Sequence, residues 1–216
     1  MRRTILIFGC LSALIPAIFG CTSRYLTITE KIKLHDEQIK QSNMKGCVPG
    51  CILFEGDSNM ELIDFQDYFS EPCCNYSKRG STTEYLIRRM KQINKEKPDI
   101  IVMLVGGNDL LKNTPLEVID KNYSAVLSYY KTITKKIYCI SNLPVHPNFY
   151  LKNPDIINLN RNLERICARD GAVYVNAYPH FLQKGALNQT YARDMVHLNK
   201  AGQDLLVAVL KKYMKK

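Results

Sequence analysis

Hydrophobic residues in this chain fall into short continuous runs, and between these runs they recur every three or four positions. The continuous runs lie at 51–54, 99–105, 136–141 and 172–176. Apolar runs of this length, each followed by glycine or polar residues, predict strands that are buried on both faces of a sheet.

Helical spacing of apolar residues fills the stretches between these strands. It predicts helices at 28–39, 118–133 and 156–168, and a last helix that starts after Asn199. One more helix is expected to begin at Ser81-Thr82-Thr83-Glu84, which has the spacing of a capping box. Strands that alternate with helices indicate an α/β fold with a parallel sheet, in which sites form at the carboxyl ends of the strands.

The N-terminus has the pattern of an export signal. Arg2 and Arg3 precede an apolar run at 5–19, which is short for a membrane span and contains Pro16. The run ends in Ile18-Phe19-Gly20-Cys21, which resembles the bacterial lipobox. In that motif the cysteine is lipidated and becomes the first mature residue.

This resemblance implies three regions. We predict a lipoprotein-type signal peptide at 1–20, a tether with an N-terminal helix at 21–46, and the folded domain at 47–216. Lipid on Cys21 would anchor the protein to a membrane of the bacterial cell envelope, on its periplasmic or extracellular face. An uncleaved N-terminal anchor and plain secretion are the alternatives.

Composition fits one folded domain and excludes a disordered or collagen-like chain, because 46% of the 216 residues are hydrophobic and 23% are charged. The net charge is +10, and loss of 1–20 removes two arginines and no acid. The basic residues are dispersed, without the aromatic-interleaved pattern of a nucleic-acid site, so no nucleic-acid partner is expected. They form either solvated faces or a surface attracted to anionic lipid or wall polymer.

The chain has eight cysteines, and some of them could form disulfides outside the cytoplasm. Cys10 lies in the signal, Cys21 is the lipidation site, and Cys139 and Cys167 sit in apolar patterns typical of buried thiols. The remaining four lie in loop-like stretches, where one disulfide or none is expected: Cys47, Cys51, Cys73 and Cys74. Their spacing forms no paired zinc motif, so neither a metal nor another cofactor is predicted.

Four short polar blocks carry the candidate chemistry. Gly56-Asp57-Ser58-Asn59 and Gly106-Gly107-Asn108-Asp109 follow two predicted strands, Arg79-Gly80-Ser81 precedes a helix, and Asp194-Met195-Val196-His197 stands near the C-terminus. A serine, an oriented histidine and convergent N–H donors are what acyl transfer from an ester requires. Asp57 and Asp109 are expected to hold the loops, and His35, His146 and His180 to be structural or solvent-facing.

Each block predicts a role. Ser58 is the candidate nucleophile, His197 the base that takes its proton, and Asp194 the group that orients the imidazole. The oxyanion would be bound by the N–H groups of Ser58 and Gly80 and by the side-chain amide of Asn108.

These residues resemble the GDSL or SGNH hydrolases, and the platelet-activating-factor-acetylhydrolase-like branch is the most similar. Ser58, Gly80, Asn108 and His197 match the four residues that name the superfamily, and Asp194 matches its Asp-x-x-His block. The resemblance spans about 28–212 and implies a flavodoxin-like three-layer α/β/α sandwich with a mainly parallel five-stranded sheet. It also implies cleavage of esters or thioesters without metal.

The sequence departs from the family pattern at two places. Asn59 stands where Leu or Ile is common, which we expect to leave the chemistry intact, and the Gly80 block reads Arg-Gly-Ser-Thr-Thr rather than Gly-x-Gly-Asp-Thr-Thr.

We therefore predict a serine-dependent esterase, lipase or deacetylase that acts on a small-molecule, glycan or lipid ester. A non-catalytic lipoprotein that binds glycan or lipid in the same cleft, and an acyltransferase, are the alternatives. Specificity is expected in the loops at 60–79, 110–117, 144–155 and 177–193. The sequence indicates no oligomeric state.

Overall fold

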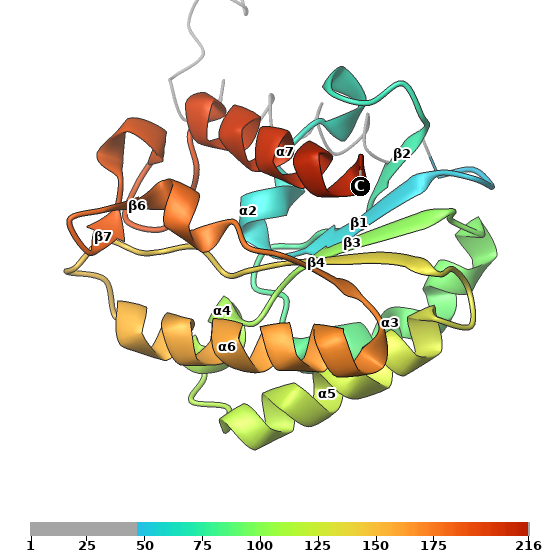
Figure 1. Cartoon of the computed structure of the whole chain (residues 1–216), viewed down its shortest axis with the longest axis horizontal. Helices are drawn as coiled ribbons and strands as arrows, with labels where there is room; N and C mark the ends of the chain where they lie inside the picture. The colour runs from blue at the N-terminus through green and yellow to red at the C-terminus, as the bar shows by residue number, and fades with distance from the viewer. Residues whose placement is uncertain (1–46, 216) are drawn as a thin grey trace, which may run out of the picture. The chain divides into compact units, whose positions relative to one another are not determined.

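The computed structural model describes residues 47–215, and they form a parallel sheet with helices on both faces (Figure 1). The predicted signal at 1–20, the lipidation site Cys21, the helix at 28–39 and His35 lie outside the described residues. The predicted three-layer α/β/α sandwich is confirmed.

The sheet has five parallel strands in the order β2-β1-β3-β4-β5. The strands are β1 (Ile52–Gly56), β2 (Cys73–Asn75), β3 (Ile100–Leu104), β4 (Lys136–Ile140) and β5 (Val173–Val175). The chain runs from β1 outward to the edge strand β2 and then returns to β3 on the other side of β1. The order of the strands reverses between β1 and β3, and ligands of such sheets bind at this crevice.

The four strands predicted from apolar runs are present, and their ends differ from the prediction by at most two residues. The sequence pattern does not predict the edge strand β2: Cys73 and Cys74, expected in a loop, lie in this strand. β2 has three residues and pairs only with β1, so it lacks the longer apolar run of a central strand. The segment at 177–193, predicted as loop, contains a small antiparallel pair, β6 (Leu182–Gln183) and β7 (Ala186–Leu187).

Two helical layers cover the sheet (Figure 1). One face packs against α3 (Thr83–Ile93), α5 (Leu116–Tyr130) and α6 (Asn153–Asp170), and the other against α7 (Lys200–Met214) and the short α2 (Ser58–Glu61). The remaining short elements are α4 (Gly107–Leu111), η2 (Phe65–Asp67), η3 (Asn94–Glu96), η4 (Tyr178–Phe181) and η5 (Gln189–Tyr191).

Alternate residues of each central strand enter different cores. Val102 and Leu104 of β3 pack on the α7 side, whereas Ile101 and Met103 pack on the side of α3, α5 and α6. Because both faces are covered, every position favours an apolar side chain, which explains the unbroken hydrophobic runs of the sequence.

Helix α3 begins one residue later than the capping-box spacing predicts. The backbone N–H of Ser81 donates to Lys78 O at 3.0 Å, and Thr82 is the N-cap, accepting from Tyr85 N at 3.3 Å. Glu84 is therefore one residue too early to close a capping box and instead pairs with Arg88 one turn later.

A buried ionic cluster fixes β1 to the helices beneath it. Glu55 is fully buried, and its carboxylate accepts from Arg89 Nε at 2.5 Å and from the Tyr130 hydroxyl. Burial raises the pKa of Glu55, although Arg89 opposes this rise. The cluster anchors the strand that leads into Ser58.

One disulfide joins Cys47 to Cys74, with Cα atoms 4.5 Å apart, and so ties the segment before β1 to β2. The predicted burial of Cys139 and Cys167 is confirmed, and Cys51 and Cys73 are also buried thiols.

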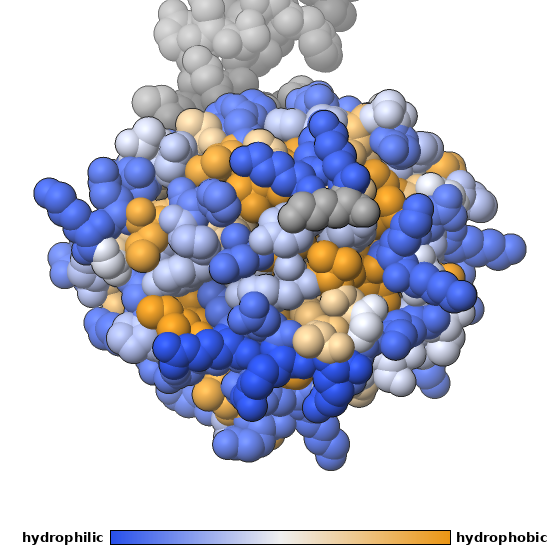
Figure 2. Space-filling model, viewed as in Figure 1, coloured by the Kyte–Doolittle hydropathy of each residue, from blue (hydrophilic) through white to orange (hydrophobic). Residues whose placement is uncertain are grey.

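The face seen in Figure 2 is mainly hydrophilic, with separate small hydrophobic patches. Within residues 47–215, no helix combines the length and the apolar character needed to cross a membrane.

Candidate active site

The four polar blocks of the sequence meet at the carboxyl ends of β1 and β3. Ser58 begins α2 directly after β1, and Asn108 lies in α4 after β3. Gly80 lies in the turn before α3, and His197 precedes α7. All four residues line one cavity of about 290 Å³.

Ser58, His197 and Asp194 form a hydrogen-bonded chain. His197 Nε2 lies 3.0 Å from Ser58 Oγ, and His197 Nδ1 lies 2.7 Å from Asp194 Oδ2. Because a carboxylate only accepts hydrogen bonds, Nδ1 carries the proton and Nε2 is left to accept from the serine hydroxyl. This arrangement can remove a proton from Ser58.

Asp194 is held as a carboxylate by its surroundings. Partial burial alone would raise the pKa of Asp194, but hydrogen bonds from the N–H groups of Val196 and His197 and from the His197 ring outweigh it and lower the pKa. The two backbone bonds, at 2.9 and 2.8 Å, also fix the loop that presents the imidazole.

The sharp turn into α2 depends on Gly56 and Asp57. A Cβ at Gly56 would lie 2.7 Å from Leu104 O and 2.9 Å from Met60 Sδ, so only glycine fits. Asp57 caps α2 by accepting from Asn59 N at 2.9 Å. Burial raises the pKa of Asp57 to about 6, and the charge of Asp109 adds to this rise.

The candidate oxyanion donors point to the same cavity from separate elements. Among the described residues, no group accepts a hydrogen bond from the backbone N–H of Ser58 or Gly80. Gly80 has φ +77°, which is the conformation expected at the third position of the turn closed by Ser81 N and Lys78 O. Asn108 Nδ2 donates to Ser81 O at 3.0 Å, which leaves its second N–H for a ligand.

Asp109 joins α4 to α3, as predicted for a loop-holding residue. Its carboxylate accepts from Thr83 N at 3.0 Å and from Thr83 Oγ1 at 2.6 Å. These bonds fix the spacing between the Gly80 turn and Asn108.

Sequence reasoning missed two buried asparagines that support this loop. Asn142 Oδ1 accepts from Gly107 N at 2.8 Å, and its Nδ2 donates to Val105 O at 3.1 Å. Asn160 of α6 in turn holds the backbone of Asn142 through bonds of 2.8 and 2.9 Å. The polar pair Ser141-Asn142 after β4 is the signal that points to Asn142, whereas the role of Asn160 is visible only in three dimensions.

Much of the wall of the cavity is apolar. It is formed mainly by Leu111, Leu143, Val145, Phe149, Leu151 and Val196. The predicted loops at 110–117 and 144–155 contribute to this wall, and 60–79 contributes Arg79, but none of the lining residues comes from 177–193. His146 and His180 do not line the cavity either.

The described residues contain no group of three or more His, Cys, Asp or Glu side chains that could hold a metal ion.

Comparisons with known proteins agree with this architecture. The sequence profile of the GDSL-like lipase/acylhydrolase family matches residues 64–205. No curated protein sequence matches the chain.

Solved structures share the fold. A Streptococcus pneumoniae protein provisionally assigned as a platelet activating factor is 25% identical, with a TM-score of 0.69 over 84% of this chain and 91% of its own. A GDSL-like lipase of Bacteroides thetaiotaomicron is 20% identical, with a TM-score of 0.69 over 87% and 97%. The acetylxylan esterase Axe2 of Geobacillus stearothermophilus is 17% identical, with a TM-score of 0.65 over 76% and 94%.

The profile match covers well over half of the chain, and the solved structures share its fold. The chain therefore belongs to the GDSL-like lipase/acylhydrolase family.

Proposed function

We propose that this protein is a serine-dependent ester hydrolase that works through an acyl-enzyme on Ser58. The observation that carries the proposal is the chain of contacts from Asp194 through His197 to Ser58, at 2.7 and 3.0 Å, in a cavity that also holds unpartnered N–H donors. Membership of an acylhydrolase family supports it.

The reaction follows from the roles of these groups. His197 Nε2 takes the hydroxyl proton as Ser58 Oγ attacks the ester carbonyl carbon, and the oxyanion is bound by the N–H groups of Ser58 and Gly80 and by Asn108 Nδ2. Collapse of the tetrahedral intermediate breaks the bond to the alcohol, which leaves with the proton from His197. A water molecule then attacks the acyl-enzyme by the same route, releasing the acid and restoring Ser58.

The size and lining of the cavity favour a compact acyl group. A volume of about 290 Å³ lies at the lower end of the range for ligand pockets, and much of the cavity wall is apolar. A long hydrocarbon chain would have to leave this cavity. We therefore expect acetyl and other short acyl esters to be hydrolysed best.

The test is hydrolysis of p-nitrophenyl acetate. Ser58→Ala is expected to abolish turnover while circular dichroism and urea unfolding show an intact fold. Ser128→Ala, an exposed serine on α5, is the matched control and should keep full activity. Activity retained by Ser58→Ala would contradict the proposal, and a wild type that binds esters without turnover would favour the non-catalytic alternative.

We also propose that the protein is anchored in the cell envelope through lipid on Cys21. The lipobox-like sequence supports this, and the Cys47–Cys74 disulfide is typical of proteins outside the cytoplasm. Metabolic labelling with a fatty acid should mark the wild type and fail to mark Cys21→Ser. Labelling that survives this substitution would contradict it.

A further inference from the structure

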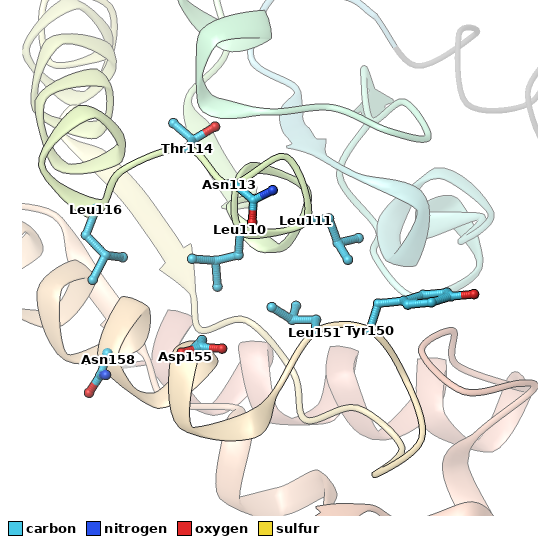
Figure 3. A pocket seen from close by; sticks show the side chains of 9 residues that line it. All are labelled: Leu110, Leu111, Asn113, Thr114, Leu116, Tyr150, Leu151, Asp155 and Asn158. Atoms are coloured by element: carbon cyan, nitrogen blue, oxygen red, sulfur yellow. The ribbon is translucent and has the colours of Figure 1, made fainter.

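The structure has a second cavity, of about 490 Å³ (Figure 3). Leu111 and Leu151 line both this cavity and the candidate catalytic cavity, so the two cavities are neighbours. The second cavity is formed by α4 with the loop after it and by the beginnings of α5 and α6. It takes no part in the mechanism described above.

Polar side chains surround this second cavity. The exposed Asn113, Asp155 and Asn158 and the half-buried Thr114 line it, and none of these side chains hydrogen-bonds to another protein group within residues 47–215. In Figure 3, Asp155 and Asn158 lie on the side of the cavity opposite Thr114 and Asn113. Amide, hydroxyl and carboxylate groups therefore remain available to a ligand from two sides.

Asn158 differs from the other asparagines of α6 because it is exposed, whereas they are buried or half-buried. Asn153 Nδ2 donates to Val145 O at 3.0 Å, Asn160 Nδ2 to Asn142 O at 2.9 Å, and Asn162 Nδ2 to Asp120 Oδ2 at 2.9 Å. Each of these three amides holds another part of the fold. The amide of Asn158 has no such partner among the described residues.

Apolar surfaces complete the second cavity. Leu110 and Leu116 line it between the polar groups, and Tyr150 stands at its edge with 90% of its surface exposed. An aromatic ring that is almost fully exposed contributes nothing to the core and offers a flat face to a ligand. The cavity thus combines hydrogen-bonding side chains with flat apolar surface.

The chemistry of this lining favours some classes of bound ester over others. A hydrocarbon chain would bury the polar side chains without partners, which is unfavourable. A phosphate group would meet Asp155, the one charged residue of the lining, and no lysine or arginine. A sugar ring presents hydroxyls at its edges and C–H groups on its faces, and so matches both kinds of surface.

We propose that the second cavity binds the sugar of a glycan ester whose short acyl group lies at Ser58. This inference rests on the proposed ester hydrolase function for the scissile bond. Asn158 and its polar neighbours would bind the hydroxyls, and Tyr150 would pack against the face of the sugar.

The kinetic test compares two substrates. Asn158→Ala and Tyr150→Ala are each expected to raise KM for an O-acetylated xylo- or chito-oligosaccharide about 3- to 10-fold. The ratio of kcat/KM on that oligosaccharide to kcat/KM on p-nitrophenyl acetate should fall accordingly. Alanine suits the interior of α6, and Asn94→Ala, an exposed asparagine at the end of α3, is the matched control.

A binding test separates this proposal from the hydrolase proposal. Isothermal titration of Ser58→Ala with the deacetylated oligosaccharide should show binding that weakens about 3- to 10-fold when Asn158→Ala is added. If the oligosaccharide binds but the wild type hydrolyses no ester, the hydrolase proposal is contradicted and the glycan site is not. Hydrolysis of p-nitrophenyl acetate, with an oligosaccharide KM and affinity that both variants leave unchanged, would overturn the glycan site. Variants that instead raise KM for a lysophospholipid would assign the cavity to a lipid headgroup and would also overturn it.

Discussion

Asn59 Oδ1 accepts a hydrogen bond from the backbone N–H of Leu198 at 3.2 Å. The residue after the candidate nucleophile is thereby joined to the residue after the candidate base, although 139 positions of sequence separate them. The substitution of Asn for the common Leu or Ile, which looked neutral in the sequence, therefore supplies a contact between the two halves of the site.

Removing this contact is expected to loosen the spacing between Ser58 and His197. Asn59→Ala should lower kcat about 3- to 10-fold, with a smaller effect on KM, and should reduce the free energy of unfolding by about 1 kcal/mol. Steady-state hydrolysis of p-nitrophenyl acetate and urea unfolding measure the two effects. An unchanged kcat would show that the bond has no positioning role.

Asn108 is expected to act on the transition state rather than on the bound ester. Asn108→Ala should lower kcat about 10²- to 10³-fold and leave KM nearly unchanged, because its amide would bind charge that develops only during the reaction. This substitution also removes the 3.0 Å hydrogen bond to Ser81 O, so the thermal stability of the variant should be measured alongside its kinetics. A variant that folds normally and keeps its kcat would remove Asn108 from the oxyanion site.

The buried carboxyl of Asp57 predicts a pH dependence of stability. Its pKa is about 6 in the folded protein, because of burial and the charge of Asp109, and is about 3.9 in an unfolded chain. Between these values the folded state binds more protons, so the free energy of unfolding falls as pH rises, by on the order of 2–3 kcal/mol.

Asp57→Asn removes this titration and keeps an oxygen to cap α2. Its stability relative to the wild type should increase from about pH 4 to about pH 6 and stay constant above that range. Urea unfolding of both proteins at several pH values measures the difference. A difference that is independent of pH would contradict the raised pKa.

The Cys47–Cys74 disulfide is expected to stabilise the edge of the sheet. It closes a loop with a sequence separation of 27, so Cys47→Ala should lower the free energy of unfolding by about 3 kcal/mol. Reducing agent should destabilise the wild type by a similar amount and leave Cys47→Ala unaffected. If reducing agent destabilises both proteins equally, the Cys47–Cys74 disulfide is not the source of the stabilisation.

The sequence predicts the parts of the fold that local pattern encodes. Central strands such as β3 form unbroken apolar runs that end just before glycine, so they can be identified without the structure. The edge strand β2 cannot, since its three residues carry no periodicity and its pairing with β1 depends on contacts distant in sequence. Helix α3 begins one residue later than the sequence predicts, because the backbone N–H of Ser81 closes the preceding turn.

The same distinction applies to the candidate site. Ser58, Asp194 and His197 stand in short motifs that can be recognised, and the structure brings them within hydrogen-bonding distance. The residues that hold their loops do not stand in motifs. Asn142 and Asn160 meet only after β4 and α6 pack together, and the unpartnered amide of Asn158 differs from theirs only in what surrounds it.

The central claim is that Ser58 is a nucleophile activated by His197, and covalent labelling tests it most directly. The protein is treated with a fluorophosphonate and the modified peptide is identified by mass spectrometry. We predict one adduct, on Ser58, which forms much more slowly in His197→Ala and is absent in Ser58→Ala. An unlabelled wild type, or an adduct on another residue, would contradict the claim.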